Sequence, residues 1–303
     1  MRWRNLAETA LARLAAGLGP RGQWPGWVYP DAAPATGRRD ISAPLTALGI
    51  LALRDLPLAG MDEIVRRSRE HIERTVQPGG LWRYYANIPP DTDDTAMCAL
   101  ALGLNHLLVR GQTADSLAAT RLANGRFPTW FESGWSPVID AVPNAHVVAV
   151  IGPGPTTDAA IAWLIEVVAT GSEAAASTYY LDPLDLHLAL TRAVAAGVEA
   201  LQPTVEIAAA RALERLRRGG LSPYRMAQAL VVAAVSANPG VTDLSEAATR
   251  LAQCSEPDGG WPADTLYVAG NTELGGLWHY QSWAVVTALC VRALVMAATL
   301  KGS

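Results

Sequence analysis

Two kinds of apolar segment alternate along the chain. One kind is amphipathic, as in MDEIVRRSREHIERTV from Met61, where apolar residues recur at helical spacing opposite a charged side. The other kind is apolar on nearly all sides, as in SAPLTALGILAL from Ser42. Amphipathic helices are predicted near 5–16, 61–76, 113–123, 156–169, 203–217 and 242–254. Apolar helices are predicted to begin near Ser42, Asp91, Asp140, Asp182, Ser222 and Gln281.

This alternation predicts the fold. A helix that is apolar on all sides must be buried all round, whereas an amphipathic helix covers only one face. The repeated order therefore indicates an inner ring and an outer ring of helices, which is an all-α fold with a single (α/α)6 barrel of six outer/inner helix pairs. We expect one domain over residues 1–303, because no linker interrupts the repeats. No alternating run of strand length competes with the helices.

Composition and charge argue against a nucleic-acid partner, a membrane-spanning segment and a secretory signal. Half of the residues are hydrophobic, 17% are charged and the net charge is −4, so no basic surface for nucleic acid is expected. No run reaches about 18 uninterrupted apolar residues, and the first residues lack the apolar core of a secretory signal. The three cysteines, Cys98, Cys254 and Cys290, show no metal-ligand spacing and are predicted to be core thiols in a reducing cytoplasm.

Aromatic residues gather in the segments that lead from an outer helix to an inner helix. All eight Tyr and seven of the ten Trp lie there or at the first turn of an inner helix. Because the inner helices of such a barrel run the same way, we expect an aromatic rim at one mouth. The seven tryptophans in these connecting segments are Trp24, Trp27, Trp82, Trp130, Trp135, Trp261 and Trp278.

The stretch PPDTDDT, before one apolar helix, carries three carboxylates. Asp is a favoured N-cap residue, and we expect Asp40, Asp140 and Asp182 to cap their helices. If Asp91 or Thr92 caps, Asp94 lies about one turn further on and can return a bond to the backbone, which leaves Asp93 with no capping role.

Like charges so close together beside apolar and aromatic residues should keep at least one carboxyl group protonated to higher pH than usual. A protonated carboxylic acid among aromatic rings suits proton transfer to an alkene, since π faces stabilise the resulting carbocation.

These residues also carry a family resemblance. DTDDTA, Asp91 to Ala96, resembles the DxDDTA motif of class II terpene cyclases, and PDGGWPADTLY from Pro257 resembles their repeated Gly-Trp elements. GGLWHYQSWAVVTALCVRAL resembles the last inner helix of the same family. The resemblance implies that Asp93 protonates a terminal alkene or epoxide, and that Asp91 and Asp94 orient its proton.

The resemblance further implies a pocket lined by aromatic rings that shape the substrate chain and stabilise carbocations. Asn144, His146 and His187 are candidates for ending the reaction or orienting the acid, whereas Trp261 is expected to be structural. The aromatic candidates are Trp82, Tyr84, Tyr85, Trp130, Tyr179, Tyr180, Trp278 and Tyr280.

The activity implied is that of an isoprenoid cyclase, of the isomerase or intramolecular lyase type, in secondary metabolism. Its substrate would be farnesyl or geranylgeranyl diphosphate or a prenylated metabolite. Protonation requires no cofactor and no metal site is expected, although Mg²⁺ would accompany a diphosphate, with Arg38, Arg39 and Arg83 the basic groups nearest the expected mouth. Members of the family usually have two or three domains. Either the substrate sits inside this single barrel, or a second chain, in a homodimer or from a partner subunit, closes the chamber.

Two other functions are consistent with the pattern. An inverting glycoside hydrolase on an (α/α)6 barrel would need a second carboxylate about 6.5–9.5 Å from the acid. Asp258 and Glu273 are the candidates. A non-catalytic barrel would instead bind an isoprenoid or complete another subunit. Protein prenyltransferase β-subunits share the barrel, but their zinc ligands are not evident in this sequence.

Overall fold

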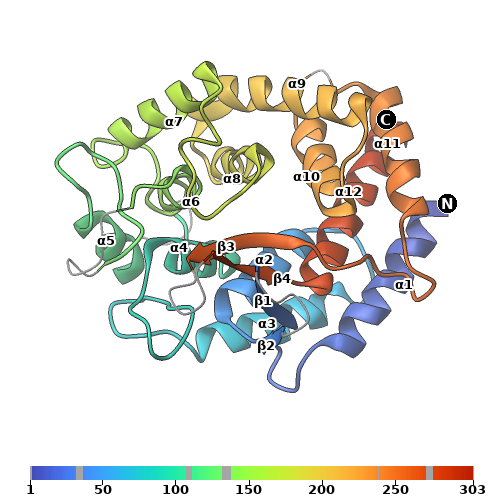
Figure 1. Cartoon of the computed structure of the whole chain (residues 1–303), viewed down its shortest axis with the longest axis horizontal. Coiled ribbons are helices and arrows are strands. Elements are labelled where there is room, and N and C mark those ends of the chain that lie inside the picture. The colour runs from blue at the N-terminus through green and yellow to red at the C-terminus, as the bar shows by residue number, and fades with distance from the viewer. Residues whose placement is uncertain are drawn as a thin grey trace. The chain divides into compact units, whose positions relative to one another are not determined.

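The computed structural model describes residues 2–31, 37–106, 111–131, 138–237, 239–270 and 276–302. Helices dominate these residues, and short strands occur near both ends of the chain (Figure 1). The outer helices are α1 (Arg2–Gly17), α3 (Met61–Glu73), α5 (Gln112–Ala119), α7 (Asp158–Thr170), α9 (Gln202–Arg218) and α11 (Val241–Gln253). The inner helices are α2 (Ala43–Leu53), α4 (Thr92–Ala101), α6 (Ala141–Ile151), α8 (Pro183–Ala195), α10 (Pro223–Ala234) and α12 (Trp283–Gly302). The 3-10 helix η2 (Glu199–Leu201) precedes α9.

The helices confirm the predicted alternation of outer and inner segments. Every residue of α2 and α4 is buried, and so is α6 from Ala141 to Val150. In α11, by contrast, the buried residues Leu244, Ala247, Ala248 and Leu251 form a single stripe. Burial on all sides therefore follows the apolar segments, and burial on one side follows the amphipathic ones.

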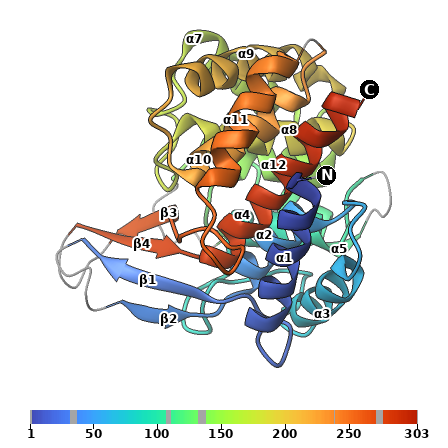
Figure 2. The ribbon, with the colours of Figure 1, turned by 90° about the vertical axis from the view of Figure 1, so that its right-hand side faces the viewer.

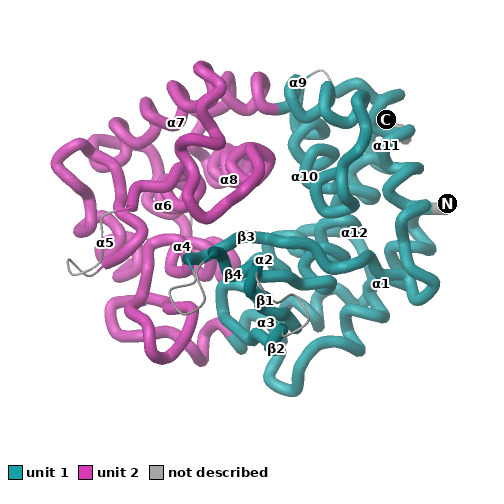
Figure 3. The backbone as a smooth tube through the Cα atoms, in the orientation of Figure 1, with its two compact units in different colours: residues 1–71, 209–303 teal, residues 72–208 magenta. Residues whose placement is uncertain are grey.

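The chain divides into two compact units, shown in two colours in Figure 3. Unit 1 contains residues 1–71 and 209–303, and unit 2 contains residues 72–208. In unit 2 the inner helices α4, α6 and α8 pack in sequence order, and the outer helices α5 and α7 pack against α6. In unit 1 the inner helix α12 packs against α1, α2, α10 and α11. That residues 1–303 form one domain stays a prediction.

A small antiparallel sheet in unit 1 corrects the expectation that no strand is present. Its order is β2 (Arg38–Asp40), β1 (Gly26–Pro30), β4 (Leu277–Gln281), β3 (Thr265–Gly270). Figure 2 shows the four strands side by side. They are too short for a clear two-residue period, and β1 pairs with β4 from the other end of the chain, so local pattern analysis missed them.

Helix α12 is the one helix among the described residues whose length and apolar composition would allow it to cross a membrane. Of the window Trp283–Leu300, 61% is buried inside the structure. This burial is typical of a core helix.

Side-chain oxygens cap the inner helices. Asp91, Asp140 and Asp182 accept hydrogen bonds from backbone N–H groups of the first turns of α4, α6 and α8. Ser42, Ser222 and Ser282 do the same for α2, α10 and α12. The expectation for Asp40 is wrong, because Asp40 lies in β2 and Ser42 caps α2.

The cysteines fit the prediction only in part. All three thiols are free, and Cys98 and Cys290 are buried in inner helices as expected. Cys254 is exposed because it ends the outer helix α11, so it is not a core thiol.

Three buried tryptophans fasten the connections to the helices. The backbone N–H of each donates to a threonine of the following inner helix, and its indole N–H donates to an outer helix. These bonds confirm the structural role predicted for Trp261. Phe127 bonds to Asn144 of α6 in the same manner. The tryptophan pairs are Trp24 with Thr46, Trp82 with Thr95 and Trp261 with Thr287.

We expect the substitution Thr287→Val to lower the free energy of unfolding by about 1–3 kcal/mol, because it leaves the buried Trp261 N–H without its acceptor. Denaturant midpoints of wild type and variant measure this change. Thr249→Val is the control, since that exposed hydroxyl bonds only to Ser245 of its own helix. Equal losses from the two substitutions would contradict the proposed fastening.

Candidate functional site

The acidic motif forms the first turn of α4. Asp91 precedes the helix, and its Oδ1 accepts the backbone N–H of Asp94 at 2.7 Å. Asp91, Asp93 and Asp94 are all buried. Of the two caps that the sequence allowed, Asp91 is therefore the one that caps α4.

The connection 127–130 lies along this first turn. Thr92 donates its N–H to Thr129 and its hydroxyl to the carbonyl of Pro128, and Asp91 forms an isolated β-bridge with Trp130. Asn144 fixes the start of this connection, because its amide group exchanges hydrogen bonds with the backbone of Phe127. Asn144 thus has a positioning role in the fold, and its predicted contact with substrate stays a prediction.

Asp93 is bonded at both carboxylate oxygens. Its Oδ1 lies 2.7 Å from Nδ1 of His146 in α6, and its Oδ2 accepts the hydroxyl of Tyr180 at 2.5 Å. The Asp93 side chain is 12% exposed, whereas that of His146 is 2% exposed. Both side chains are therefore largely enclosed, and that of Asp93 keeps the larger accessible area.

Asp140 positions the segment that carries Tyr180. As the cap of α6, its Oδ1 accepts the N–H of Val142, while Oδ2 accepts the N–H groups of Thr178 and Tyr179. These bonds fix the backbone next to Tyr180, so the phenol can reach Asp93. Asp140 was expected only to cap, and its second role depends on residues nearly forty positions away.

Burial and mutual repulsion set the electrostatics of the first turn. Burial, and then the charge of Asp93, raise the pKa of Asp91 to about 7. The charge of Asp93 opposes ionisation of Asp91, so Asp91 keeps its proton to higher pH than an ordinary aspartate. Burial also raises the pKa of the Cys98 thiol, and the nearby carboxylates raise it further.

Arg192, in the last turn of α8, completes a chain of polar groups. Its Nη1 lies 3.5 Å from Nε2 of His146, so the order is Arg192, His146, Asp93, Tyr180. Motif analysis missed Arg192. Its one available signal was a charged residue within the buried apolar helix LDLHLALTRAV.

His187 and Trp82 lie in other surroundings. The Nε2 of His187 lies 3.1 Å from Oε1 of Glu173, and both side chains are buried. Trp82 is buried, its backbone N–H donates to Thr95 and its indole N–H donates to Ile72. The same two groups of Trp261 donate to Thr287 and Leu251. We therefore expect Trp82 to hold its connection rather than to line a chamber.

The remaining aromatic candidates fall into both units. In unit 2, Trp130 donates its indole N–H to the Tyr179 hydroxyl at 3.3 Å. There Tyr84 and Tyr85 also meet edge to face, with ring centroids 4.7 Å apart. In unit 1, Tyr280 stacks on Tyr267, and Arg38 lies over the ring of Trp278. Trp135 and Glu273 lie outside the described residues.

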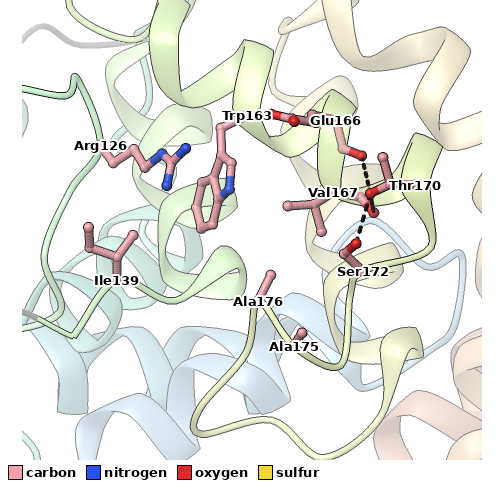
Figure 4. A pocket seen from close by; sticks show the side chains of 9 residues that line it. All are labelled: Arg126, Ile139, Trp163, Glu166, Val167, Thr170, Ser172, Ala175 and Ala176. Carbon is pink, nitrogen blue, oxygen red and sulfur yellow. Dashed lines mark hydrogen bonds between the residues drawn. The ribbon is translucent and has the colours of Figure 1, made fainter.

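An open pocket of about 400 Å³ lies on unit 2, but its lining includes none of the three carboxylates. Arg126 faces the ring of Trp163 there, 4.5 Å from its centroid, and the hydroxyls of Thr170 and Ser172 bond to each other (Figure 4). Asp258, a candidate second acid of a hydrolase, is exposed and paired with Arg13. The described residues contain no group of three or more His, Cys, Asp or Glu side chains that could hold a metal ion.

Solved structures with this fold are known. No protein-family model matches the sequence, and comparison with curated proteins finds no match. A protein from Actinoplanes superposes with a TM-score of 0.77 at 18% identity, over 98% of this chain and 99% of that chain. The type II terpene cyclase MstE from Scytonema, solved as a variant with its product merosterolic acid A, gives 0.74 at 20% identity, over 98% and 97%.

The chain has the fold of a class II terpene cyclase. This likeness confirms the predicted all-α barrel class. The ent-copalyl diphosphate synthase from Streptomyces platensis matches less fully, with a TM-score of 0.63 and 18% identity over 84% of this chain and 50% of that chain. The match to MstE thus extends over nearly the whole sequence and nearly the whole of that chain.

We predict that Asp91→Asn removes part of the pH dependence of stability. The native pKa of Asp91 is above its unfolded value, so the native state binds more protons and wild type loses stability as pH rises from about 4 to about 7. The asparagine still offers Oδ1 to the Asp94 N–H but cannot ionise.

Melting temperatures of wild type and variant should therefore agree near pH 4, and the variant should melt higher at pH 8. Asp62→Asn is the control, because Asp62 is an exposed first-turn carboxylate of α3. Parallel curves for wild type and Asp91→Asn would contradict the raised pKa.

Proposed function

We propose that this protein is a protonation-initiated isoprenoid cyclase in which Asp93 is the general acid. The observation that carries the proposal is the first turn of α4. There the buried carboxyl group of Asp93 is bonded by Tyr180 and His146, and the neighbouring Asp91 has a raised pKa. The terpene cyclase fold supports the same chemistry.

The reaction would begin when the O–H bond of Asp93 breaks and its proton bonds to the terminal carbon of an alkene. The π electrons of that alkene form the new C–H bond, which leaves a carbocation on the adjacent carbon. Further double bonds then attack in turn and close rings. Loss of a proton from carbon ends the sequence, so the product is an isomer of the substrate, and Asp93 must be reprotonated before the next cycle.

The likeness to known cyclases favours one substrate class. MstE is described in complex with its substrate geranylgeranyl dihydroxybenzoate, and this chain matches MstE over nearly all of both chains. We therefore propose a prenyl chain joined to a second metabolite as the substrate, with free farnesyl or geranylgeranyl diphosphate as the alternative. The protonation step itself needs no metal ion, and Mg²⁺ would serve only a diphosphate group.

The test is incubation of purified protein with geranylgeranyl dihydroxybenzoate and with both prenyl diphosphates, with and without Mg²⁺, in H₂O and in D₂O. Mass spectrometry should find a cyclic product of the same mass as its substrate in H₂O, carrying one solvent deuterium in D₂O. A product without deuterium would contradict initiation by protonation.

We expect Asp93→Asn to lower the rate of product formation by at least about a hundredfold, because asparagine has no acidic proton. Asp182→Asn is the matched control, since Asp182 also begins an inner helix and asparagine preserves a cap. Circular dichroism verifies that both variants are folded. Undiminished cyclisation by Asp93→Asn would refute the assignment of the acid.

A further inference from the structure

The open pocket on unit 2 contains an arginine that is not paired with an acid. The pocket has a volume of about 400 Å³, and its wall is formed by α7, by the connection before α6 and by the connection after α7 (Figure 4). We propose that this pocket binds a small organic acid that has a carboxylate at one end, an aromatic body, and a hydroxyl group at the other end.

The guanidinium of Arg126 has unused hydrogen-bond donors. Its central carbon lies 4.5 Å from the centroid of the Trp163 ring, so the ring covers one face of the guanidinium. The five N–H groups lie in the guanidinium plane, and stacking on a ring does not use them. Within the described residues the side chain of Arg126 donates no hydrogen bond and forms no ion pair. Its edge can therefore form the bidentate bond that arginine makes with a carboxylate.

The charges of the lining favour a ligand with a single negative charge. Arg126 is half-buried, whereas Glu166, the acid in the described part of the lining, is exposed and is not paired with Arg126. Water screens an exposed charge more than a half-buried one, so the potential inside the pocket has the sign of Arg126. A carboxylate matches this single cation. A phosphate group carries about two charges at pH 7 and would meet no second cation in the described lining.

The hydroxyl groups of Thr170 and Ser172 offer the ligand an acceptor. Thr170 donates its hydroxyl proton to the carbonyl of Glu166 at 2.8 Å. The 2.8 Å bond between the two hydroxyls must therefore be donated by Ser172. Oγ of Ser172 keeps lone pairs but has no proton left for a ligand, so it favours a donor such as a hydroxyl group. Figure 4 shows Ser172 and Arg126 on opposite sides of Trp163, which separates this donor from the carboxylate of the ligand.

Apolar side chains lie between the two polar ends. Trp163, Val167 and Ala176 occupy this part of the lining, and Ile139 adds to it below Arg126 in the view of Figure 4. An aromatic body would bury apolar area here and would also gain a ring contact with the indole.

Backbone hydrogen bonds fix the wall of the pocket without a ligand. Gly171 ends α7 in the left-handed conformation, with φ 73°, and the N–H of Ser172 returns to the carbonyl of Val167. The carbonyl of Ala176 accepts the N–H of Ala141, which ties the same connection to the first turn of α6. Because the site is formed in advance, little free energy is lost to ordering it when a ligand binds.

The test is isothermal titration calorimetry of the full chain at pH 7 with four probes. 6-Hydroxy-2-naphthoate has both polar ends, 2-naphthoate lacks the hydroxyl group, 2-naphthol lacks the carboxylate, and inorganic phosphate lacks the aromatic body. We expect 6-hydroxy-2-naphthoate to bind most tightly, 2-naphthoate about fivefold more weakly and 2-naphthol at least about tenfold more weakly, because hydrogen bonds to charged groups contribute more than neutral ones. Phosphate should give no measurable heat.

Three results of this titration would overturn the proposal. They are absence of binding by 6-hydroxy-2-naphthoate, binding of 2-naphthol as tight as that of the acid, and binding of phosphate as tight as that of the acid. None of these measurements involves Asp93 or turnover, so their failure is distinct from failure of the cyclase assignment.

Variants locate the bound probe. Arg126→Gln should weaken binding of both naphthoates at least about tenfold. Arg121→Gln is the matched control and should change neither affinity, because Arg121 is an exposed arginine of the same connection that is not part of the described lining. Unchanged affinities in Arg126→Gln would overturn the proposal.

Ser172→Ala tests the other end of the ligand and does not depend on how Arg126→Gln folds. Without the acceptor, the affinities for 6-hydroxy-2-naphthoate and 2-naphthoate should come within about twofold of each other, while that for 2-naphthoate changes little. A wild-type ratio of the two affinities in Ser172→Ala would overturn the assignment of the hydroxyl end.

Discussion

Burial of helix N-termini is the constraint on which this structure depends. The first turn of a helix has backbone N–H groups without partners, and an inner helix that is buried on all sides cannot leave them to water. Each inner helix accordingly begins at a serine or aspartate that accepts from those groups. Carboxylates are thereby brought into apolar surroundings as part of ordinary folding. At the start of α4 two further acids, Asp93 and Asp94, lie beside the capping Asp91.

Hydrogen bonds between the connections and the inner helices bring the partners of Asp93 together. Thr92 bonds the 127–130 connection to the start of α4, while Asp140 bonds the next connection to the start of α6. Tyr180 follows directly on that second connection and reaches Asp93. The phenol is therefore held by backbone bonds of a neighbouring repeat. A shift of either connection would move the donors of Asp93 without touching the motif itself.

The helices and the acid could be predicted because their signals are local. An apolar run after a capping residue fixes the start of an inner helix, and the crowding of acids from Asp91 to Asp94 is visible in four consecutive letters. The partners of Asp93 could not be predicted, since His146 and Tyr180 are 53 and 87 residues away and only the packing of α4, α6 and α8 brings them together. The sheet was missed for the same reason, because Trp27 pairs with Gln281. At Trp82, whether a tryptophan fastens a connection or lines a pocket depends on burial, which sequence does not reveal.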